Sequence, residues 1–281
     1  MPLDFSHRVI FSDNMTVLGQ IPDGSVDLVY IDPPFNTGKT QARTQIQVER
    51  DEEGDRVGFQ GNRYKTEVLG TMGYEDDFDD YLAFLAPRLQ HAHRVLAQHG
   101  NLYFHIDYRE VHYCKILLDR IFGRENFLNE IIWAYDYGGR PKRRWPPKHD
   151  NILVYVKDIE KYTFNREDIE RIPYMAPGLV GKEKAKKGKL PTDTWWHTIV
   201  SPTGKEKTGY PTQKPLGIMR RIIAASSNPG DLVLDFFAGS GSTGAAALEL
   251  ERRFLLVDNN PEAIQVMKQR FKGQAVEFVE V

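Results

Sequence analysis

The chain has 281 residues, an ordinary apolar and charged composition, and a formal net charge of −2. This length suits one large α/β domain or two small ones. A single cysteine, Cys114, excludes an internal disulfide framework and is typical of a reducing compartment. No apolar stretch is long enough to cross a bilayer, and the first residues lack the regions of a signal peptide. We therefore expect a cytoplasmic protein without membrane contact.

Short apolar runs alternate with helical patterns along the chain. The predicted strands, in chain order, are 8–11, 26–31, 101–106, 130–135, 152–156, 232–237 and 253–258. Several are apolar nearly throughout, as parallel strands covered on both faces should be. The predicted helices are 77–100, 108–123, 217–227, 243–251 and 261–273. This alternation predicts an α/β fold with a doubly wound parallel sheet.

Two segments interrupt the alternation. Residues 36–76 are polar, and within them residues 44–61 resemble a hairpin around 51–55. Residues 137–210 are rich in Pro, Gly, Lys and Trp. We interpret both as insertions on the ligand-binding edge of the sheet, since long irregular segments of a compact domain are usually functional or disordered.

Positive charge is concentrated in the second of these segments. Residues 138–149 hold five Lys or Arg and no acid, and residues 181–189 hold five Lys and one Glu. One such run is ordinarily a solvated loop. Two runs in one segment, with Trp145, Trp195 and Trp196 nearby, favour a surface for a polyanion.

Residues 232–250 (LVLDFFAGSGSTGAAALEL) have the pattern of a strand, a glycine-rich turn and a helix. Gly239, Gly241 and Gly244 have G-x-G-x-x-G spacing, which lets a backbone turn tightly beside a ligand at a helix N-terminus. Asp258 ends the next strand, 19 residues beyond Gly239, where an acid can bind a ribose hydroxyl pair. The unit predicts a nucleoside-cofactor site, although the spacing alone also fits NAD.

The amino-acid sequence of this turn indicates which cofactor binds there. DFFAGSGST (235–243) resembles motif I of S-adenosylmethionine-dependent methyltransferases, GYPTQKPLGIM (209–219) resembles their motif X, and SDNMTVL (12–18) resembles motif III. The resemblance implies that Asp235 faces the cationic end of the cofactor and that Asp13 lies near the adenine. The cofactor-binding residues that it implies are Asp13, Asp32, Pro211, Thr212, Lys214, Asp235, Phe236, Phe237, Ala238, Gly239, Ser240, Gly241, Ser242, Thr243, Asp258 and Asn259.

The predicted strand 26–31 ends in Asp32-Pro33-Pro34-Phe35, which resembles the catalytic motif IV of amino-directed DNA methyltransferases. The order of the motifs resembles the β class of that family over nearly the whole chain. The resemblance implies a mostly parallel, seven-stranded sheet of the class I methyltransferase type. Residues 1–136 would form the catalytic half with the insertion 36–76, residues 137–208 the target-recognition region with a sheet strand at 152–156, and residues 209–281 the cofactor half.

The chemistry of an exocyclic amine explains the residue types of this motif. Adenine N6 and cytosine N4 are poor nucleophiles because their lone pairs are delocalised into the ring. Asp32 and the carbonyl of Pro33 can accept the amino hydrogens and stabilise the positive charge that grows during attack on a sulfonium methyl group. The prolines fix the direction of these acceptors, and Phe35 offers a face on which a flipped base can stack.

Other chemistries find less support. Methylation of a ring carbon needs a cysteine nucleophile, and we interpret Cys114 as a buried helix residue. The eight histidines have no convincing metal spacing, so no metal and no catalytic histidine are assigned. An RNA or protein-glutamine methyltransferase is a second hypothesis, since related enzymes have a similar Pro-Pro tip after Asn. A non-catalytic DNA-binding module is a third.

The predicted DNA contacts lie mainly in the basic segment. The resemblance implies double-stranded DNA as the partner, and the candidate DNA-binding residues are Asn36, Lys39, Arg140, Lys142, Arg143, Arg144 and Lys148. Trp195 and Trp196 are expected to be structural, and part of 39–72 is expected to be mobile without DNA. In family usage, Asp before Pro-Pro favours adenine N6 over cytosine N4, and members often form homodimers or pair with a restriction endonuclease.

Overall fold

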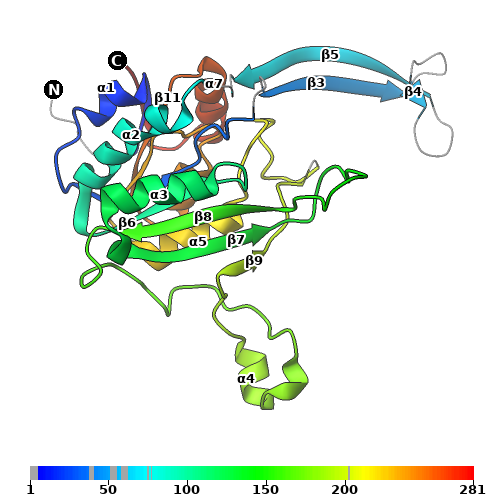
Figure 1. Ribbon diagram of the computed structural model, residues 1–281. Coiled ribbons are helices and arrows are strands. Elements are labelled where there is room, and N and C mark those ends of the chain that lie inside the picture. The colour runs from blue at the N-terminus through cyan, green and yellow to red at the C-terminus, as the bar shows by residue number, and fades with distance from the viewer. Residues whose placement is uncertain are drawn as a thin grey trace.

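One large sheet forms the centre of the computed structural model, which describes residues 6–37, 41–50, 56–57, 63–74, 76, 78–201 and 203–281. Within these residues the sheet has nine strands, in the spatial order β12-β1-β11-β10-β2-β6-β8-β7-β9 (Figure 1). The strands are β1 (Arg8–Phe11), β2 (Val26–Ile31), β6 (Leu96–Ile106), β7 (Phe127–Ala134), β8 (His149–Val156), β9 (Thr194–Trp196), β10 (Leu232–Asp235), β11 (Arg253–Asp258) and β12 (Glu277–Glu280).

The predicted α/β fold with a mostly parallel sheet is confirmed. The six strands from β12 to β6 are parallel, β8 is antiparallel to its neighbours β6 and β7, and β9 is parallel to β7. All seven predicted strands belong to this sheet. The expected count of seven is too low by β9 and β12, which were missed because edge strands of three and four residues have no long apolar run.

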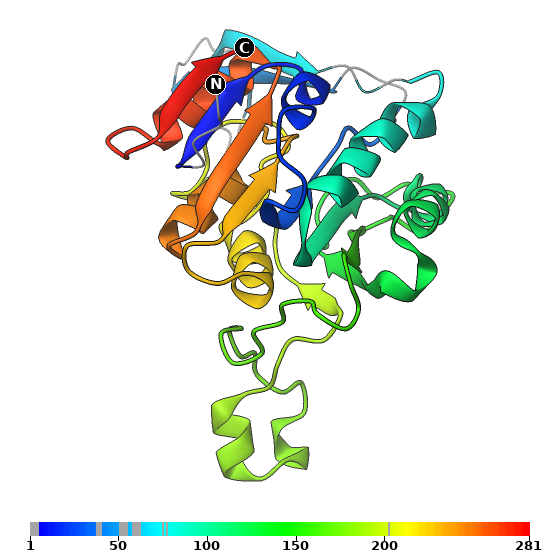
Figure 2. The same ribbon diagram turned by 90° about the vertical axis from the view of Figure 1, so that its left-hand side faces the viewer.

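Two layers of helices cover the sheet (Figure 2). On one face, α1 (Asn14–Leu18), α2 (Tyr81–Val95) and α3 (Val111–Phe122) bury apolar side chains against the strands. On the other face, α5 (Leu216–Ser226), α6 (Ser242–Glu249) and α7 (Pro261–Arg270) do the same. The central strands are therefore covered on both faces, which is why their sequences are almost entirely apolar.

The direction of the chain changes between β10 and β2, which are neighbours in the sheet. From β10 the chain passes through α6 to β11 on one side, and from β2 it reaches β6 on the other side. Ligands of open α/β sheets bind at such a point, outside the carboxyl ends of the strands. The two motif-bearing tips, after Ile31 and at Asp235, lie at this point.

The insertion after β2 forms a separate sheet that projects from the body of the molecule (Figure 1). Its strands are β3 (Gln41–Arg50), β4 (Arg56–Val57) and β5 (Arg63–Tyr74), in the order β3-β5-β4. The expected hairpin around 51–55 is wrong in its pairing, because β3 pairs with β5 and β4 lies on the other edge of β5. Residues 51–55 lie outside the described residues, and the expected mobility of 39–72 stays a prediction.

The basic middle segment begins after β7 and includes β8. Beyond β8 the chain extends away from the sheet. It includes the short helices η3 (Pro177–Leu179) and α4 (Lys182–Lys187), which lie away from the sheet in Figure 1. β9 then returns the chain to the edge of the sheet beside β7. Trp195 of β9 is buried, as expected for a structural residue, but Trp196 is 74% exposed, so the structural interpretation is wrong for Trp196.

The predicted helix 77–100 is too long, because α2 ends at Val95 and β6 begins at Leu96. Leu96 pairs with Val26 of β2. The residues after Val95 therefore belong to the sheet, although their sequence continues the helical pattern. Gly100 is a strand residue and not the helix end. Asp80 begins α2 by accepting a hydrogen bond from the Ala83 N–H, as capping residues do.

Cys114 is fully buried in α3, as predicted, and burial raises the pKa of its thiol to about 12. The remaining short helix of the described region is η2 (Arg124–Asn126), which leads into β7. No helix among the described residues is long and apolar enough to cross a bilayer.

Candidate active site

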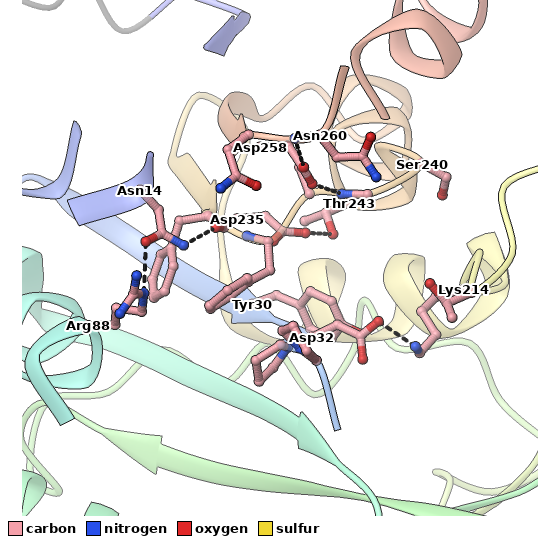
Figure 3. A pocket seen from close by; sticks show the side chains of 18 of the residues that line it. Asn14, Tyr30, Asp32, Arg88, Lys214, Asp235, Ser240, Thr243, Asp258 and Asn260 are labelled. Atoms are coloured by element: carbon pink, nitrogen blue, oxygen red, sulfur yellow. Dashed lines mark hydrogen bonds and ion pairs between the residues drawn. The ribbon is translucent and has the colours of Figure 1, made fainter. Parts of the chain in front are cut away.

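A pocket of about 350 Å³ lies at the carboxyl ends of β2, β10 and β11, and it brings most of the predicted site residues together (Figure 3). The predicted residues that line it are Asp13, Asp32, Pro33, Pro34, Phe35, Thr212, Lys214, Asp235, Phe236, Phe237, Ala238, Gly239, Ser240, Ser242, Thr243, Asp258 and Asn259. Pro211 and Gly241 do not line it. The sequence reasoning missed Ser12, Asn14, Tyr30, Phe78, Phe84, Arg88, Tyr210 and Asn260, which also line the pocket.

The glycine turn forms the wall of the pocket after β10. Gly239 has a φ of +49° and Gly241 a φ of +72°, the left-handed region that favours glycine. A Cβ atom at Gly239 would lie 3.0 Å from the Tyr210 ring. Gly241 is the N-cap of α6 and packs on Met267 and Phe271, so it shapes the turn from behind.

Asp235 ends β10 inside the pocket with almost no solvent exposure. Its carboxylate accepts hydrogen bonds from the Thr243 hydroxyl at 2.6 Å and from the Phe237 N–H at 3.0 Å. Burial raises the pKa of Asp235 to about 7, although these two donors lower it. The Asp235 carboxyl therefore exchanges its proton near neutral pH.

Asp258 supports the glycine turn directly. One carboxylate oxygen accepts the Gly239 N–H at 2.7 Å, and the other accepts the Asn260 N–H at 2.8 Å. Burial raises the pKa of Asp258, and these backbone donors lower it in part. The acid expected to bind a ribose thus also holds the loop that would contact the cofactor.

Asn14 and Arg88 form the part of the pocket opposite the glycine turn (Figure 3). The Asn14 amide donates to the carbonyl of Phe236 at 2.9 Å and accepts from Arg88 at 2.8 Å. The Arg88 guanidinium lies 3.8 Å from the centre of the Phe84 ring. Asp13 accepts the Met15 N–H and so begins α1, in addition to lining the pocket. Neither Phe84 nor Arg88 was predicted, because helix α2 reaches the pocket only in the folded sheet.

The Asp-Pro-Pro-Phe tip lies beside the glycine turn, and Asp32 is paired with Lys214 of motif X. The Lys214 ammonium also lies 5.3 Å from the centre of the Phe35 ring. The Tyr81 hydroxyl donates to the Pro34 carbonyl, which fixes the tip against α2. Asp32 keeps one buried oxygen, Oδ1, without a hydrogen-bond partner among the described residues. This oxygen is available to a hydrogen donor that enters the pocket.

Asn36 and Lys39, which follow the Asp-Pro-Pro-Phe tip, were predicted to bind DNA. Asn36 donates from its side chain to Glu110 at 2.9 Å and accepts the Phe78 N–H at 3.2 Å, while its own N–H donates to Asp76. Its φ of +53° is a conformation that Asn tolerates better than most residues. Asn36 therefore ties the end of the tip to the body, and Lys39 lies outside the described residues.

The basic loop between β7 and β8 exposes most of its predicted DNA contacts. Arg140, Lys142, Arg143 and Arg144 are exposed, and Trp145 is 94% exposed. Lys148 is different, because its ammonium donates to the carbonyls of Tyr137, Gly138 and Gly139 at 2.7 to 3.0 Å. These three bonds use its three donors and stabilise the loop, and the DNA contact of Lys148 stays a prediction that would require them to break.

One group of potential metal ligands occurs among the described residues. Asp27, His99 and Asp231 bring ligand atoms within 4.8 Å of one another. They come from three separate elements near the amino ends of the strands, so no spacing in the sequence could have indicated them. The group lies outside the pocket lining, and His99 already pairs with Asp27 at 2.9 Å.

Comparison with known proteins matches this chain to DNA methylases. The family model N6_N4_Mtase, described as "DNA methylase", matches residues 26–269. The Type II methyltransferase M.HpaI of Haemophilus parainfluenzae is 31% identical over 267 residues, covering 95% of this chain and 74% of the relative. The DNA adenine methyltransferase YhdJ of Escherichia coli is 31% identical over 275 residues, covering 93% and 81%.

Solved structures share the fold at lower identity. The M1.HpyAVI–SAM complex superposes with a TM-score of 0.61 at 23% identity, covering 94% of this chain and 98% of that one. The cytosine-N4-specific PvuII DNA methyltransferase has a TM-score of 0.65 at 15% identity, covering 96% and 88%. The chain therefore belongs to the N6/N4 family of DNA methylases, and the sequence-based assignment to an S-adenosylmethionine-dependent DNA methyltransferase is confirmed.

Proposed function

We propose that this protein transfers the methyl group of S-adenosylmethionine to N6 of an adenine that is flipped out of duplex DNA. One observation carries the proposal: the acceptor tip at Asp32 and the glycine turn at Gly239 line the same pocket. A nucleophile at the first and a nucleoside cofactor at the second would therefore meet. When bound, the cofactor supplies the methyl group and the sulfonium leaving group.

The pocket residues fit S-adenosylmethionine. The close approach of the Tyr210 ring to Gly239 leaves no room for a side chain at that position, as expected where backbone must contact a ligand. Asp235 provides a carboxyl group for the cationic end of the cofactor. Asp258 and Asn259 are proposed to bind the ribose, and Asn14 with Arg88 and Phe84 is proposed to bind the adenine end.

The residues that we propose to be catalytic lie in the tip formed by Asp32, Pro33, Pro34 and Phe35. Asp32 Oδ1 and the Pro33 carbonyl are proposed to accept the two amino hydrogens of the target base, so that the nitrogen lone pair turns toward the methyl group. Stabilising the positive charge that develops on nitrogen is the main source of rate in this account. The target base is proposed to stack on Phe35. A base within a duplex cannot reach a pocket at the sheet edge, so flipping is required.

Adenine is proposed over cytosine for two reasons. Asp precedes the Pro-Pro pair at position 32, and the relative YhdJ, which is 31% identical, is described as a DNA adenine methyltransferase. Cytosine N4 offers the same kind of amino group and is the second candidate. The fold neighbour PvuII methyltransferase is cytosine-N4-specific, but at 15% identity that likeness concerns the fold alone.

The DNA contacts are proposed for residues 137–208 as a target-recognition region within a single methyltransferase domain. The exposed side chains of Arg140, Lys142, Arg143 and Arg144 support this role, since clustered Arg and Lys bind phosphates and guanine edges. A homodimer and a cognate restriction endonuclease are further proposals. The second follows from relatives described as type II methyltransferases, such as M.HpaI and M.BglII. Action on DNA implies a cytoplasmic, nucleoid-associated protein.

Labelled methyl transfer tests the substrate class. The purified protein and the Asp32→Ala variant are incubated with tritiated S-adenosylmethionine and duplex DNA, RNA or a mixture of proteins. The proposal expects label in DNA with the unaltered chain and none with Asp32→Ala, while both bind the cofactor. Label in RNA or protein, or equal transfer by the variant, contradicts the proposal.

A further inference from the structure

His105 lies beside Asp32 in the middle of the sheet and was not assigned a role by the sequence. It is on β6, where the neighbouring residue Phe104 pairs with Ile31, the last residue of β2 before Asp32. Its side chain is fully buried. The ring lies 5.8 Å from the centre of Phe35 and 5.6 Å from that of Trp133. A fully buried imidazole thus packs directly behind the catalytic tip.

Polar groups from β2, from its tip and from β8 surround this ring. Nε2 lies 3.2 Å from Oδ2 of Asp150 on β8, and Nδ1 lies 2.8 Å from the Tyr30 hydroxyl on β2. Nδ1 is also 3.9 Å from Oδ1 of Asp32, the buried oxygen without a hydrogen-bond partner in the described region. The Tyr135 hydroxyl donates to the other oxygen of Asp150 at 3.2 Å. Asp32, His105, Asp150 and Tyr135 thus form a row of polar side chains. This row runs from the pocket across the sheet to the base of the loop between β7 and β8.

The tautomer of His105 follows from Asp150. Burial raises the pKa of Asp150, but the hydrogen bonds from His105 and Tyr135 and the positive charge of Lys214 lower it by more, so that the pKa lies below its ordinary value. An ionised Asp150 requires a hydrogen on Nε2. The lone pair of Nδ1 then accepts the Tyr30 hydroxyl and faces Asp32. This is the orientation of a histidine that can take up a proton.

We propose that His105, held by Asp150, is the relay that removes the reaction proton from Asp32. The proposal rests on the proposed DNA methyl transfer. It explains why a histidine is buried within 4 Å of the free Asp32 oxygen. It also gives the proton a path when DNA and cofactor fill the pocket and exclude water.

Methyl transfer and removal of the proton take four steps. The nitrogen–carbon bond forms as the carbon–sulfur bond breaks, and the electron pair of the broken bond stays on sulfur. The methylated nitrogen is then cationic and loses one hydrogen to Oδ1 of Asp32. The Tyr30 hydroxyl turns away from Nδ1 of His105, the proton moves to Nδ1, and Asp32 becomes a carboxylate again. The hydrogen already on Nε2 then passes to Asp150, whose side chain is 13% exposed, and from there to solvent.

Other charged groups near the relay enter its pH dependence. Asp32 and Tyr30 face His105 from β2 and its tip, Asp150 faces it from β8, and Tyr135 reaches Asp150 from the end of β7. Lys214 pairs with Asp32. Because the relay must be neutral to accept a proton, the pH profile of methyl transfer is one readout of its role.

The test compares three variants in single-turnover methyl transfer to duplex DNA. His105→Gln keeps an amide that can donate to Asp150 but takes up no proton, and Asp150→Asn leaves the histidine in place. His99→Gln is the matched control, since His99 lies on the same strand and also pairs with an aspartate, Asp27, at 2.9 Å. Dissociation constants for cofactor and DNA and a thermal melt are measured for each.

The relay predicts that His105→Gln and Asp150→Asn bind cofactor and DNA as the unaltered chain does. Their single-turnover rates should fall about tenfold or more, within the usual range for proton-transfer groups. His105→Gln should also change the shape of the pH profile of the rate, because it removes the only imidazole of the relay. His99→Gln should keep both rate and pH profile.

Two results would overturn the relay. One is a pH profile of His105→Gln that has the same shape as that of the unaltered chain. The other is an equal loss of rate and of cofactor binding in Asp150→Asn, which indicates packing alone. Failure of the proposed function is distinct, because then the unaltered chain itself transfers no methyl group to DNA.

Discussion

The ammonium group of Lys214 lies against the carboxylate of Asp32, although 182 positions separate the two residues in the sequence. Both side chains are largely buried, at 11% and 15% exposed. The carbonyl of Lys214 also accepts the Ser242 hydroxyl at 2.8 Å, at the start of α6. Lys214 therefore connects the glycine turn to the acceptor tip, and the two halves of the pocket meet at one residue.

Replacing Lys214 by Met should slow methyl transfer more than it weakens DNA binding. The Asp32 carboxylate would lose the partner that orients it, and misplacing a reacting group by about 1 Å can cost on the order of 100-fold in rate. We expect a loss of about 10- to 100-fold in single-turnover rate. Lys214→Arg keeps the charge and should retain more of the rate. Equal rates for Lys214→Met and the unaltered chain would show that the pair does not orient Asp32.

The pKa of Asp235, about 7, makes stability depend on pH. Since the pKa in the fold exceeds that of an unfolded chain, protonated Asp235 stabilises the fold fully below about pH 4, and this contribution is lost as pH rises through 7. The shift corresponds to at most about 4 kcal/mol. Urea denaturation of the unaltered chain and Asp235→Asn, between pH 4 and 8, measures it. The difference in unfolding free energy should change with pH, and a constant difference would contradict the assignment.

Cofactor binding should follow the same carboxyl. A sulfonium or ammonium cation favours ionised Asp235, so the affinity for S-adenosylmethionine should rise with pH through about 7. Asp235→Asn should bind more weakly at pH 8 and lose the rise. Calorimetric titration at several pH values measures both affinities, and a rise retained in the variant would point to a different group.

Gly244 should tolerate a side chain poorly, because a Cβ atom there would lie 2.7 Å from Leu256 and 3.1 Å from Phe271. We expect Gly244→Ala to destabilise the fold by about 1–3 kcal/mol, the usual cost of overpacking a core. Gly178→Ala is the matched control, since nothing lies within 4 Å of that position. Thermal melts of both variants test the difference, and equal melting temperatures would contradict the packing.

The exposed cations of the basic loop should carry the salt dependence of DNA binding. Replacing Lys142, Arg143 and Arg144 by Ala should weaken binding and reduce the slope of log K against log salt by about 0.9 for each phosphate that the variant no longer neutralises. Lys161→Ala is the control, because Lys161 follows β8 at the opposite end from the loop. Binding isotherms at several salt concentrations distinguish the two. A similar change in slope for both variants would place the DNA elsewhere.

The central sheet could be predicted because its strands are buried on both faces and are therefore continuous apolar runs. The strands 8–11, 26–31 and 253–258 have the predicted bounds, and the motif residues at their tips line one pocket. The predictions failed for two short strands at the edges of the sheet and for the strand pairing of the insertion. β9 and β12 are short, and the pairing of β3 with β5 depends on a register that alternation does not specify.

The site residues that were missed share a different cause. Asn14, Phe84 and Arg88 reach the pocket from helices α1 and α2, and no local spacing marks them. His105 and Asp150 meet only because β6 and β8 are neighbours in the sheet. Lys148 is a basic residue of the kind that contacts DNA, but its ammonium group donates hydrogen bonds to backbone carbonyls of its own loop. Sequence patterns identify residues at strand tips and glycine turns, whereas contacts between elements require the fold.

The identity of the methylated base tests the central proposal most directly. Duplex DNA methylated by the unaltered chain is digested to nucleosides, and the products are identified by mass spectrometry, with Asp32→Ala as the parallel control. We predict N6-methyldeoxyadenosine from the unaltered chain and no methylated nucleoside from the variant. N4-methyldeoxycytidine as the only product would contradict the adenine assignment, and the same product from Asp32→Ala would contradict the role of the Asp32 carboxylate.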